Sequence, residues 1–400
     1  MTHLLFTLVG IGLLALTLPL VLELTLVTVP NLLPGGKKIV TPIPSPNRDA
    51  EPALAGKHLA IIVPAHNEGS LVGLSIASLR AAAGQAGKIL VVAHNCSDDT
   101  AAHAAKAGAE VLVYNDPSAV GKGFALRHGF RYALDHGADS VMVVDADSTV
   151  SANTVSAVQS AFAAGARVVQ CRYEMVSTTE RSSTRLAALA FRAFNVIRPR
   201  GRARLGFSAG ILGNGFAIDR TVLQAVPYDA FSVVEDLEYH LHLVIAGERV
   251  HYLDEALILA DFPESKAGES VQRSRWEGGR LLTARRWALP LMRKIVGGRV
   301  RLIEPLFDLT GLPMAFGVFA LILAAFVPLA WIRWYAACSL SVVLVHVLTA
   351  AWAGPDFLKT LQLLALSPVY ILRKLWMIPG VLRGSSAKAA WVRTERNNTL

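Results

Sequence analysis

The sequence predicts an α/β domain with a mostly parallel sheet, joined to apolar helices that cross a membrane. Two patterns support this: strands alternate with helices in the middle of the chain, and apolar runs of spanning length lie near both ends. Hydrophobic residues make up 53% of the 400 residues and charged residues only 17%, which is typical of a chain that partly faces lipid.

The first apolar run extends from Leu4 to Val29 and is long enough to cross a hydrocarbon core of about 30 Å. We expect a transmembrane helix over residues 1–30, retained as a signal-anchor. A cleaved signal peptide is the alternative, but it would have a shorter apolar core and a small-residue cleavage site. Residues 31–57, rich in Pro and Gly, are expected to form a linker.

Short runs rich in Val, Ile and Leu follow the linker and predict strands that are buried on both faces. They are residues 58–63, 88–92, 110–113 and 140–144, and the helices predicted between them are 71–83, 100–107 and 123–135. This alternation predicts a parallel sheet, with ligands beyond the carboxyl ends of its strands. We expect the domain to cover residues 58–298.

The C-terminal region, residues 299–400, contains two more apolar runs of spanning length. We expect transmembrane helices at 312–332 and 334–353, broken by Arg333, then an interfacial helix at 357–383 and a basic tail. A third C-terminal span over 357–383 is the alternative. The positive-inside rule then puts the domain in the cytoplasm, given the flanking basic residues Lys37, Lys38, Arg48, Arg293, Lys294, Arg299, Arg301, Lys388, Arg393 and Arg396.

Cysteine usage and charge argue against a disulfide-rich or cysteine-ligated metal protein and against a nucleic-acid-binding protein. Cys96, Cys171 and Cys338 are odd in number and widely separated, so they predict neither a disulfide framework nor a cysteine metal site. Anionic lipid headgroups explain the net charge of +9 more simply than nucleic acid does, since no nucleic-acid-binding motif accompanies it.

Two acidic motifs are candidates for chemistry. Asp145 and Asp147 follow the fourth predicted strand, where alternate side chains of an extended chain can face one Mg²⁺ or Mn²⁺ ion that neutralises a departing diphosphate. Turn-capping aspartates are the alternative. Glu235 and Asp236 begin a predicted helix that ends at Gly247, where an acid either stabilises the helix dipole or acts as a general base.

A third motif, Gln272 to Trp276, puts Gln272, Arg275 and Trp276 on one face of a predicted helix. Arginine binds phosphate oxygens bidentately, and an indole ring offers a platform for a sugar. An amphipathic helix at the membrane surface, with Trp and Arg at the headgroups, is the alternative.

In this order the motifs resemble those of membrane-bound family-2 glycosyltransferases, which include cellulose, chitin and hyaluronan synthases and ceramide glucosyltransferases. The resemblance covers residues 58–276, through IIVPAHNE at 61–68, HNCSDDT at 94–100, GKGFAL at 121–126, DAD at 145–147, GNGF at 213–216, ED at 235–236 and QRSRW at 272–276. It implies a GT-A fold and an inverting displacement at the anomeric carbon by an acceptor hydroxyl.

The resemblance also implies roles for individual residues. Asp236 is the implied general base, and Asp145 and Asp147 hold the donor and a Mg²⁺ or Mn²⁺ ion. The other implied substrate-binding residues are Pro64, Ala65, Glu68 and His94 at the nucleoside, Lys122 near the nucleotide, Asn214 and Glu235 in their motifs, Gln272 and Arg275 at the diphosphate, and Trp276 at the acceptor.

The chain departs from the family pattern after the second strand. Many members have an aspartate there that accepts a hydrogen bond from uracil, whereas this chain has Ala93 and His94. A neutral imidazole or Asp98 can take over that role, and guanine is a second candidate base. Val234 replaces the Thr often found before Glu-Asp, a change from which we expect little effect.

Two further segments prompt hypotheses. Residues 195–205 carry four arginines and read as an irregular basic loop that either grips a lipid-linked pyrophosphate or is an ordinary solvated surface. His240, His242 and His251 lack partner ligands at metal-binding spacing.

The expected function is transfer of a hexose or N-acetylhexosamine from a nucleotide-diphosphate sugar, with UDP-sugar as the first choice, to a polysaccharide or lipid-linked acceptor at the cytoplasmic face of a bacterial inner membrane. A single addition to a lipid and a catalytically silent scaffold of an export complex are the alternatives. The expected partners are donor, acceptor and bilayer, with a second copy or an export partner left open.

Overall fold

The structure is a computed structural model that describes residues 1–33, 58–84, 87–176, 181–262, 266–376 and 378–380, without the side chains of residues 266–271. It forms two compact units. The sheet unit consists of Lys37–Thr178, Ser208–Ser265 and Trp391–Leu400, and the helical unit of Met1–Gly36, Thr179–Phe207 and Lys266–Ala390. Most of the expected linker and the basic tail lie outside the described residues.

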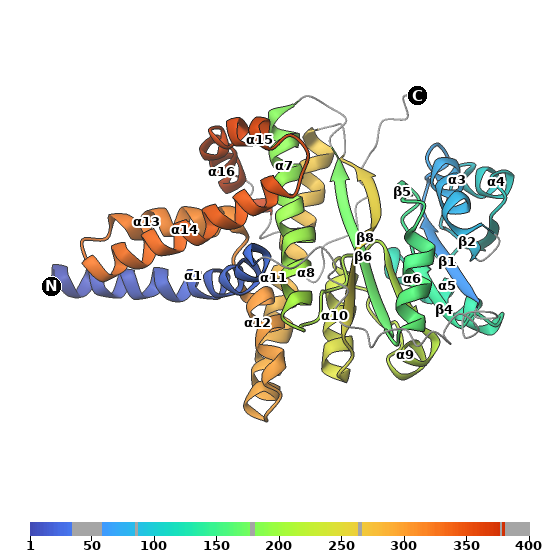
Figure 1. The fold of residues 1–400 in the computed structure, drawn as a ribbon, viewed down its shortest axis with the longest axis horizontal. Helices are drawn as coiled ribbons and strands as arrows, with labels where there is room; N and C mark the ends of the chain where they lie inside the picture. The colour runs from blue at the N-terminus through green and yellow to red at the C-terminus, as the bar shows by residue number, and fades with distance from the viewer. Residues whose placement is uncertain (34–57, 85–86, 177–180, 263–265, 377, 381–400) are drawn as a thin grey trace. The chain divides into compact units, whose positions relative to one another are not determined.

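The sheet unit is built on an eight-stranded mixed sheet with the strand order β3-β2-β1-β4-β7-β6-β8-β5 (Figure 1). β1, β2, β3 and β4 pair in parallel, whereas β7 runs antiparallel to both β4 and β6. The strands are β1 (Leu59–Ala65), β2 (Gly87–His94), β3 (Glu110–Tyr114), β4 (Ser140–Val143), β5 (Ser148–Val150), β6 (Val168–Val176), β7 (Phe216–Asp219) and β8 (Val250–Asp261).

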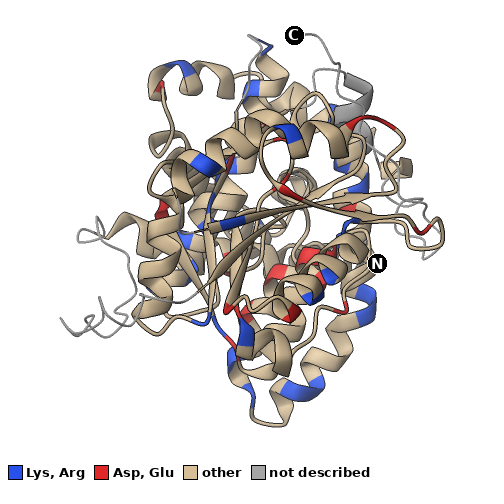
Figure 2. Cartoon of the chain, turned by 90° about the vertical axis from the view of Figure 1, so that its right-hand side faces the viewer, with Lys and Arg blue, Asp and Glu red and all other residues tan. Residues whose placement is uncertain are grey.

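Helices connect these strands and cover the sheet. They are α3 (Val72–Ala83), α4 (Thr100–Lys106), α5 (Lys122–Asp135), α6 (Thr154–Ala163), α9 (Arg220–Ala225) and α10 (Glu235–Ala246). The predicted strands and helices of the first half agree with the observed ones to within two residues at every end. Their apolar runs are buried as expected: β1 and β4 contain no charged residue, and Ile61, Val63 and Met142 lie fully buried in the core. Most of the ribbon in Figure 2 is tan, since charged residues make up only 17% of the chain.

The helical unit contains the apolar segments. Its elements are α1 (Thr2–Leu32), α7 (Ser182–Arg192), the π-helix η2 (Ala193–Ile197), α8 (Arg198–Arg204), α11 (Lys266–Val296), η3 (Val300–Leu302), α12 (Ile303–Thr310), α13 (Met314–Phe326), α14 (Ala330–Trp352), α15 (Phe357–Leu364) and α16 (Ser367–Leu375). Among the described residues, α1 and α14 are long and apolar enough to cross a membrane. A third span results if Val300–Thr310 and Met314–Phe326, bent by 83°, count as one.

The C-terminal helices begin and end elsewhere than the sequence indicated. The break in the apolar hairpin falls at residues 327–329, and Arg333 lies in the first turn of α14, where its Nε donates to the carbonyl of Val327 at 3.0 Å. The guanidinium thus satisfies a carbonyl at the break and stays compatible with a helix. Within the described part of residues 357–383, α15 and α16 are two short helices, separated at Ala365 and Leu366.

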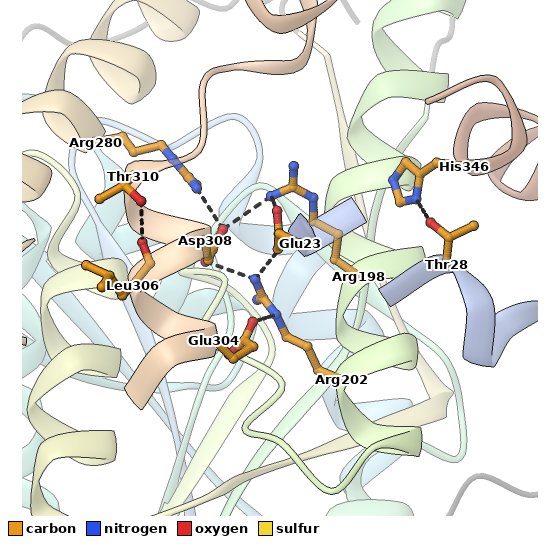
Figure 3. Close-up of polar contacts among 10 residues, drawn as sticks. All are labelled: Glu23, Thr28, Arg198, Arg202, Arg280, Glu304, Leu306, Asp308, Thr310 and His346. Atoms are coloured by element: carbon orange, nitrogen blue, oxygen red, sulfur yellow. Dashed lines mark hydrogen bonds and ion pairs between the residues drawn. The ribbon is translucent and has the colours of Figure 1, made fainter. Parts of the chain in front are cut away.

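Glu23 introduces a carboxylate into the apolar helix α1, and buried arginines neutralise it. Arg198 contacts Glu23 Oε2 at 3.0 Å, and Arg202 contacts Glu23 Oε1 at 2.9 Å (Figure 3). Asp308 of α12 joins the cluster through Arg198 at 3.2 Å, Arg202 at 3.0 Å and Arg280 of α11 at 2.7 Å, while Arg202 also pairs with Glu304. Three cations and three anions balance, which makes their burial tolerable.

The hypothesis of an irregular basic loop at residues 195–205 is wrong. The segment is helical, and Arg198 and Arg202 are buried among acidic side chains of α1 and α12. Gly201 lies so close to α1 that a Cβ would come within 2.0 Å of the Val27 carbonyl oxygen. The arginines were misread because their partners lie far away in sequence.

Replacing Arg202 with methionine should destabilise the helical unit by about 3–5 kcal/mol, because it leaves Glu23 and Glu304 without a full set of buried counter-charges. The matched control is Arg167→Met, which removes an arginine that is 48% exposed and paired with Glu248, and should cost less than about 1 kcal/mol. Thermal unfolding of the detergent-solubilised proteins measures both. Equal stability of the two variants would contradict the role of Arg202 as the buried counter-charge of Glu23 and Glu304.

Candidate active site

The candidate site lies at the carboxyl ends of the parallel strands in the sheet unit. β1 ends at Ala65, β2 at His94, and β4 leads within two residues to Asp145. Because parallel strands present their carboxyl ends at one edge, the residues after them share that edge. α5 begins at the same region with Lys122 as its first residue.

Lys122 connects two segments of this edge. Its ammonium forms an ion pair with Asp145 and donates to the Gly213 carbonyl oxygen at 2.6 Å. Burial alone would lower the pKa of Lys122, but the negative charges of Asp145, Glu235 and Asp236 outweigh it and raise that pKa. Lys122 is therefore a fixed positive charge among acids, suited to an anionic ligand.

Asp145 and Asp147 are both half-buried, and Ala146 between them is buried. The segment bends into a turn after β4, closed by the Ser148 amide donating to the Asp145 carbonyl at 3.1 Å, so the expected extended geometry is not what orients the pair. Within the described ranges, no group of three or more His, Cys, Asp or Glu side chains could hold a metal. Two carboxylates nevertheless fit Mg²⁺ or Mn²⁺, which take their remaining ligands from phosphates and water.

Asp236 lies at the start of α10, with its Oδ1 accepting from the Leu237 amide at 2.8 Å. Burial raises the pKa of Asp236, although that hydrogen bond and the charge of Lys122 act in the opposite direction. A carboxylate with a raised pKa is a stronger base than an exposed aspartate. Glu235 begins the same helix, which ends at Gly247 in the left-handed conformation as predicted.

Asn214 is 1% exposed and bonded at both ends of its amide. Its Oδ1 accepts from the Asp145 amide at 3.1 Å, and its Nδ2 donates to Ser148 Oγ at 2.8 Å. This placement lets Asn214 position the turn, and the substrate contact expected of it stays a prediction.

Two residues of β6 extend this network and were missed by the sequence analysis. Gln170 is fully buried and binds the segment at Asn214 from both sides: Nε2 donates to the Asn214 carbonyl at 2.7 Å, and Oε1 accepts from the Leu212 amide at 2.9 Å. Tyr173 bonds Asn214, and burial together with the nearby charge of Asp145 raises the pKa of its phenol. A glutamine inside an apolar strand was the available signal for Gln170, whereas nothing marked Tyr173.

The expected nucleoside residues gather at the ends of β1 and β2. Pro64 is half-buried and Ala65 buried, and the Glu68 amide donates to Thr100 Oγ1 at 2.8 Å. Asp98 accepts from the Gly69 amide at 3.1 Å and from the Thr100 amide at 3.0 Å, which assigns it to holding this loop.

His94 is 5% exposed and stacks on Tyr114, with ring centroids 4.9 Å apart, and Tyr114 stacks in turn on His128 at 4.3 Å. Burial lowers the pKa of His94, so its imidazole is neutral at pH 7. A neutral imidazole has one nitrogen that accepts and one that donates a hydrogen bond. The accepting nitrogen is the group that the sequence analysis expected to contact the nucleobase.

Gln272, Arg275 and Trp276 lie on α11 in the helical unit, whereas Lys122 and the acids belong to the sheet unit. The motif is helical as predicted. Gln272 is buried, Arg275 is half-buried, and the Trp276 ring lies 6.3 Å from that of Phe191 of α7.

Of the three histidines considered for metal, His240 is buried and bonds Ser208 Oγ at 3.0 Å.

Comparison with known proteins decides the family. The model of glycosyltransferase like family 2 matches residues 56–279, more than half of the chain. The chain belongs to this family. A search of curated proteins finds no match for it. The match covers all the motifs quoted above, from the first strand to Trp276.

One solved structure supports the fold of this family-2 chain. A mannosyltransferase from Pyrobaculum calidifontis, solved with GDP-Man and Mn²⁺, aligns with a TM-score of 0.54 and 15% identity over 96% of this chain and 99% of its own. Mannosyl-3-phosphoglycerate synthase from Rubrobacter xylanophilus aligns with a TM-score of 0.39 and 22% identity over 55% and 71% of the two chains. The expected GT-A fold, with helices of spanning length, is confirmed.

Replacing Gly213 with alanine should lower turnover by about tenfold or more, since a Cβ there would lie 3.0 Å from Asp236 Oδ2 and displace that carboxylate. The control is Gly206→Ala, which has the same φ of +78° but open space around the added Cβ. It bears the same backbone strain and should keep its activity. Steady-state release of nucleotide measures both, and equal losses would mean that strain alone is responsible.

Proposed function

We propose that this chain is an inverting glycosyltransferase that transfers a hexose or N-acetylhexosamine from a nucleotide-diphosphate sugar at the cytoplasmic membrane face. One observation supports this above all: the half-buried Lys122–Asp145 pair and the half-buried carboxylate of Asp236 meet at Gly213, at the strand ends of a family-2 fold. The Lys122 ammonium of this pair can stabilise an anionic leaving group, and the Asp236 carboxylate can deprotonate an acceptor hydroxyl.

In the proposed reaction the acceptor oxygen attacks the anomeric carbon from the face opposite the diphosphate. The new C–O bond forms as the bond from that carbon to the diphosphate oxygen breaks, and the electron pair leaves with the nucleoside diphosphate. Asp236 takes the proton of the attacking hydroxyl. A single displacement inverts the anomeric configuration.

Mg²⁺ or Mn²⁺ would be held by Asp145 and Asp147, with Asn214 and Ser148 supporting the turn that carries them. When bound, the ion supplies positive charge to the diphosphate oxygens. Lys122 adds a fixed cation beside Asp145, where negative charge develops on the leaving group. The mannosyltransferase of the same fold was solved with Mn²⁺, which supports this proposal.

The motif of α11 completes the proposed substrate contacts. By resemblance to the family, Gln272 and Arg275 bind the diphosphate and Trp276 supports the acceptor. Arg275 suits this role because a guanidinium pairs with two phosphate oxygens at once. Pro64, Ala65 and Glu68 are proposed at the nucleoside, with Glu235 near the donor.

We propose that the nucleobase of the nucleotide-sugar donor contacts the neutral imidazole of His94. UDP-sugar was the expectation from the family pattern, and the mannosyltransferase solved with GDP-Man makes GDP-sugar the second candidate. A screen of both nucleotide classes against purified protein, read out as free nucleoside diphosphate, distinguishes them. No release with any donor would favour a catalytically silent scaffold.

The proposed location is a bacterial inner membrane, crossed by α1, by α14 and by the bent pair Val300–Thr310 and Met314–Phe326. Residues 58–298 are proposed to lie in the cytoplasm as the catalytic domain. Residues 299–400 are proposed as the C-terminal membrane region. The small number of candidate spans among the described residues favours single addition to a lipid acceptor over extrusion of a polysaccharide by one copy of the chain. Analysis of product length separates the two.

Asp236→Asn should lower kcat by about 10²- to 10⁴-fold while the donor KM changes little, because an amide cannot accept the acceptor proton. The control is Asp229→Asn, whose carboxylate is 62% exposed and should be dispensable. Release of nucleoside diphosphate measures both. Normal turnover in Asp236→Asn would remove the base assignment.

Chelation of divalent cations should abolish turnover, and Mn²⁺ or Mg²⁺ should restore it. In Asp147→Asn the Mn²⁺ concentration for half-maximal activity should rise by at least about tenfold, since a charged ligand is lost. Asp135→Asn, at the exposed end of α5, is the control. Full activity in chelator, or an unchanged Mn²⁺ requirement in Asp147→Asn, would contradict the proposed metal site.

A further inference from the structure

The motif helix α11 is held on a second side by the amphipathic helix α16. Gln272, Arg275 and Trp276 share one side of α11, whereas Arg273 and Glu277, four residues apart, share another. The second side contacts α16. The two sides are parts of one rigid turn of helix, so a shift of the second side moves the first.

The contact between the two helices is specific. Glu277 Oε1 lies 2.5 Å from Lys374 Nζ, and the two side chains are only 13% and 16% exposed. The Arg273 guanidinium lies over the Tyr370 ring at 5.5 Å. A Cβ added at Gly380 would come within 3.2 Å of Ser274 Oγ, so the chain beyond α16 also lies against α11.

α16 divides its own residues between two directions. Tyr370 and Lys374, four apart, contact α11, whereas Val369, Leu372 and Trp376 are 50%, 55% and 88% exposed. Spacings of three and four residues put those three on one face. An exposed apolar stripe ending in tryptophan is typical of a helix that lies in the bilayer interface, and α16 follows the candidate span α14 closely in the chain.

We propose that α16 braces the motif helix against the lipid bilayer, with Glu277 and Lys374 as positioning residues for the diphosphate contacts of Gln272 and Arg275. The inference rests on the proposed function. The bilayer fixes the apolar face of α16, and the Glu277–Lys374 pair with the Arg273–Tyr370 contact passes that fixed position to α11. Affinity for the donor nucleotide then depends on α16, which itself bears no proposed nucleotide contact.

The test uses the full-length protein in vesicles of phosphatidylcholine and phosphatidylglycerol, and measures equilibrium binding of UDP and of GDP with Mn²⁺. Glu277→Gln and Lys374→Met should each weaken binding of whichever nucleotide the wild-type protein takes by about tenfold, or about 1.4 kcal/mol. Trp376→Glu should weaken it similarly, through loss of the bilayer contact. Lys359→Met removes an exposed pair with Asp356 and should leave binding unchanged.

Combining Glu277→Lys with Lys374→Glu reverses the pair and should recover most of the lost affinity, a rescue that general destabilisation would not produce. If the single variants unfold, the swapped variant still tests whether the Glu277–Lys374 pair supports nucleotide binding. Unchanged binding in both single variants, an equal loss in Lys359→Met, or no recovery in the swapped variant would overturn the brace. A wild-type protein that binds neither UDP nor GDP would instead contradict the proposed function.

Discussion

The ion pair of Lys122 and Asp145 is the interaction on which the candidate site depends. Lys122 begins α5, Asp145 follows β4, and the Gly213 carbonyl accepts from the same ammonium, so one side chain ties three segments. Unpaired, an ammonium on a side chain that is only 21% exposed would be expensive. Because Asp145, Glu235 and Asp236 surround it, the Lys122 ammonium keeps its charge. An incoming diphosphate can pair with the same ammonium.

Ion pairs organise the helical unit as well, and there the charged side chains are buried. Glu23 would be costly in an apolar helix, and Arg198 and Arg202 compensate its charge. Glu304 and Asp308 of α12 balance the remaining positive charge. Arg280 brings α11 into the same cluster. The helix that carries the Gln272–Trp276 motif is thus fixed at one point by buried ion pairs and at another by α16, which gives an amphipathic helix a means of influencing chemistry.

The parallel half of the sheet was predictable because its strands are continuous apolar runs, and the acidic motifs because strand ends are where ligands bind. Long-range pairing was not. The arginines of α8 looked like a surface loop because Glu23 and Asp308 lie more than a hundred residues away. Tyr173 and the support that Asn214 gives to Asp145 depend on β6 and β7 joining the sheet out of chain order, which periodicity does not encode.

The most direct test of the account is an experimental structure of the full chain with Mn²⁺ and the nucleoside diphosphate it binds. We expect Mn²⁺ on Asp147 and Asp145, with the Arg275 guanidinium within about 3 Å of a diphosphate oxygen. A diphosphate bound without Arg275, or bound away from Asp145 and Lys122, would contradict the claim that these separate motifs serve one leaving group.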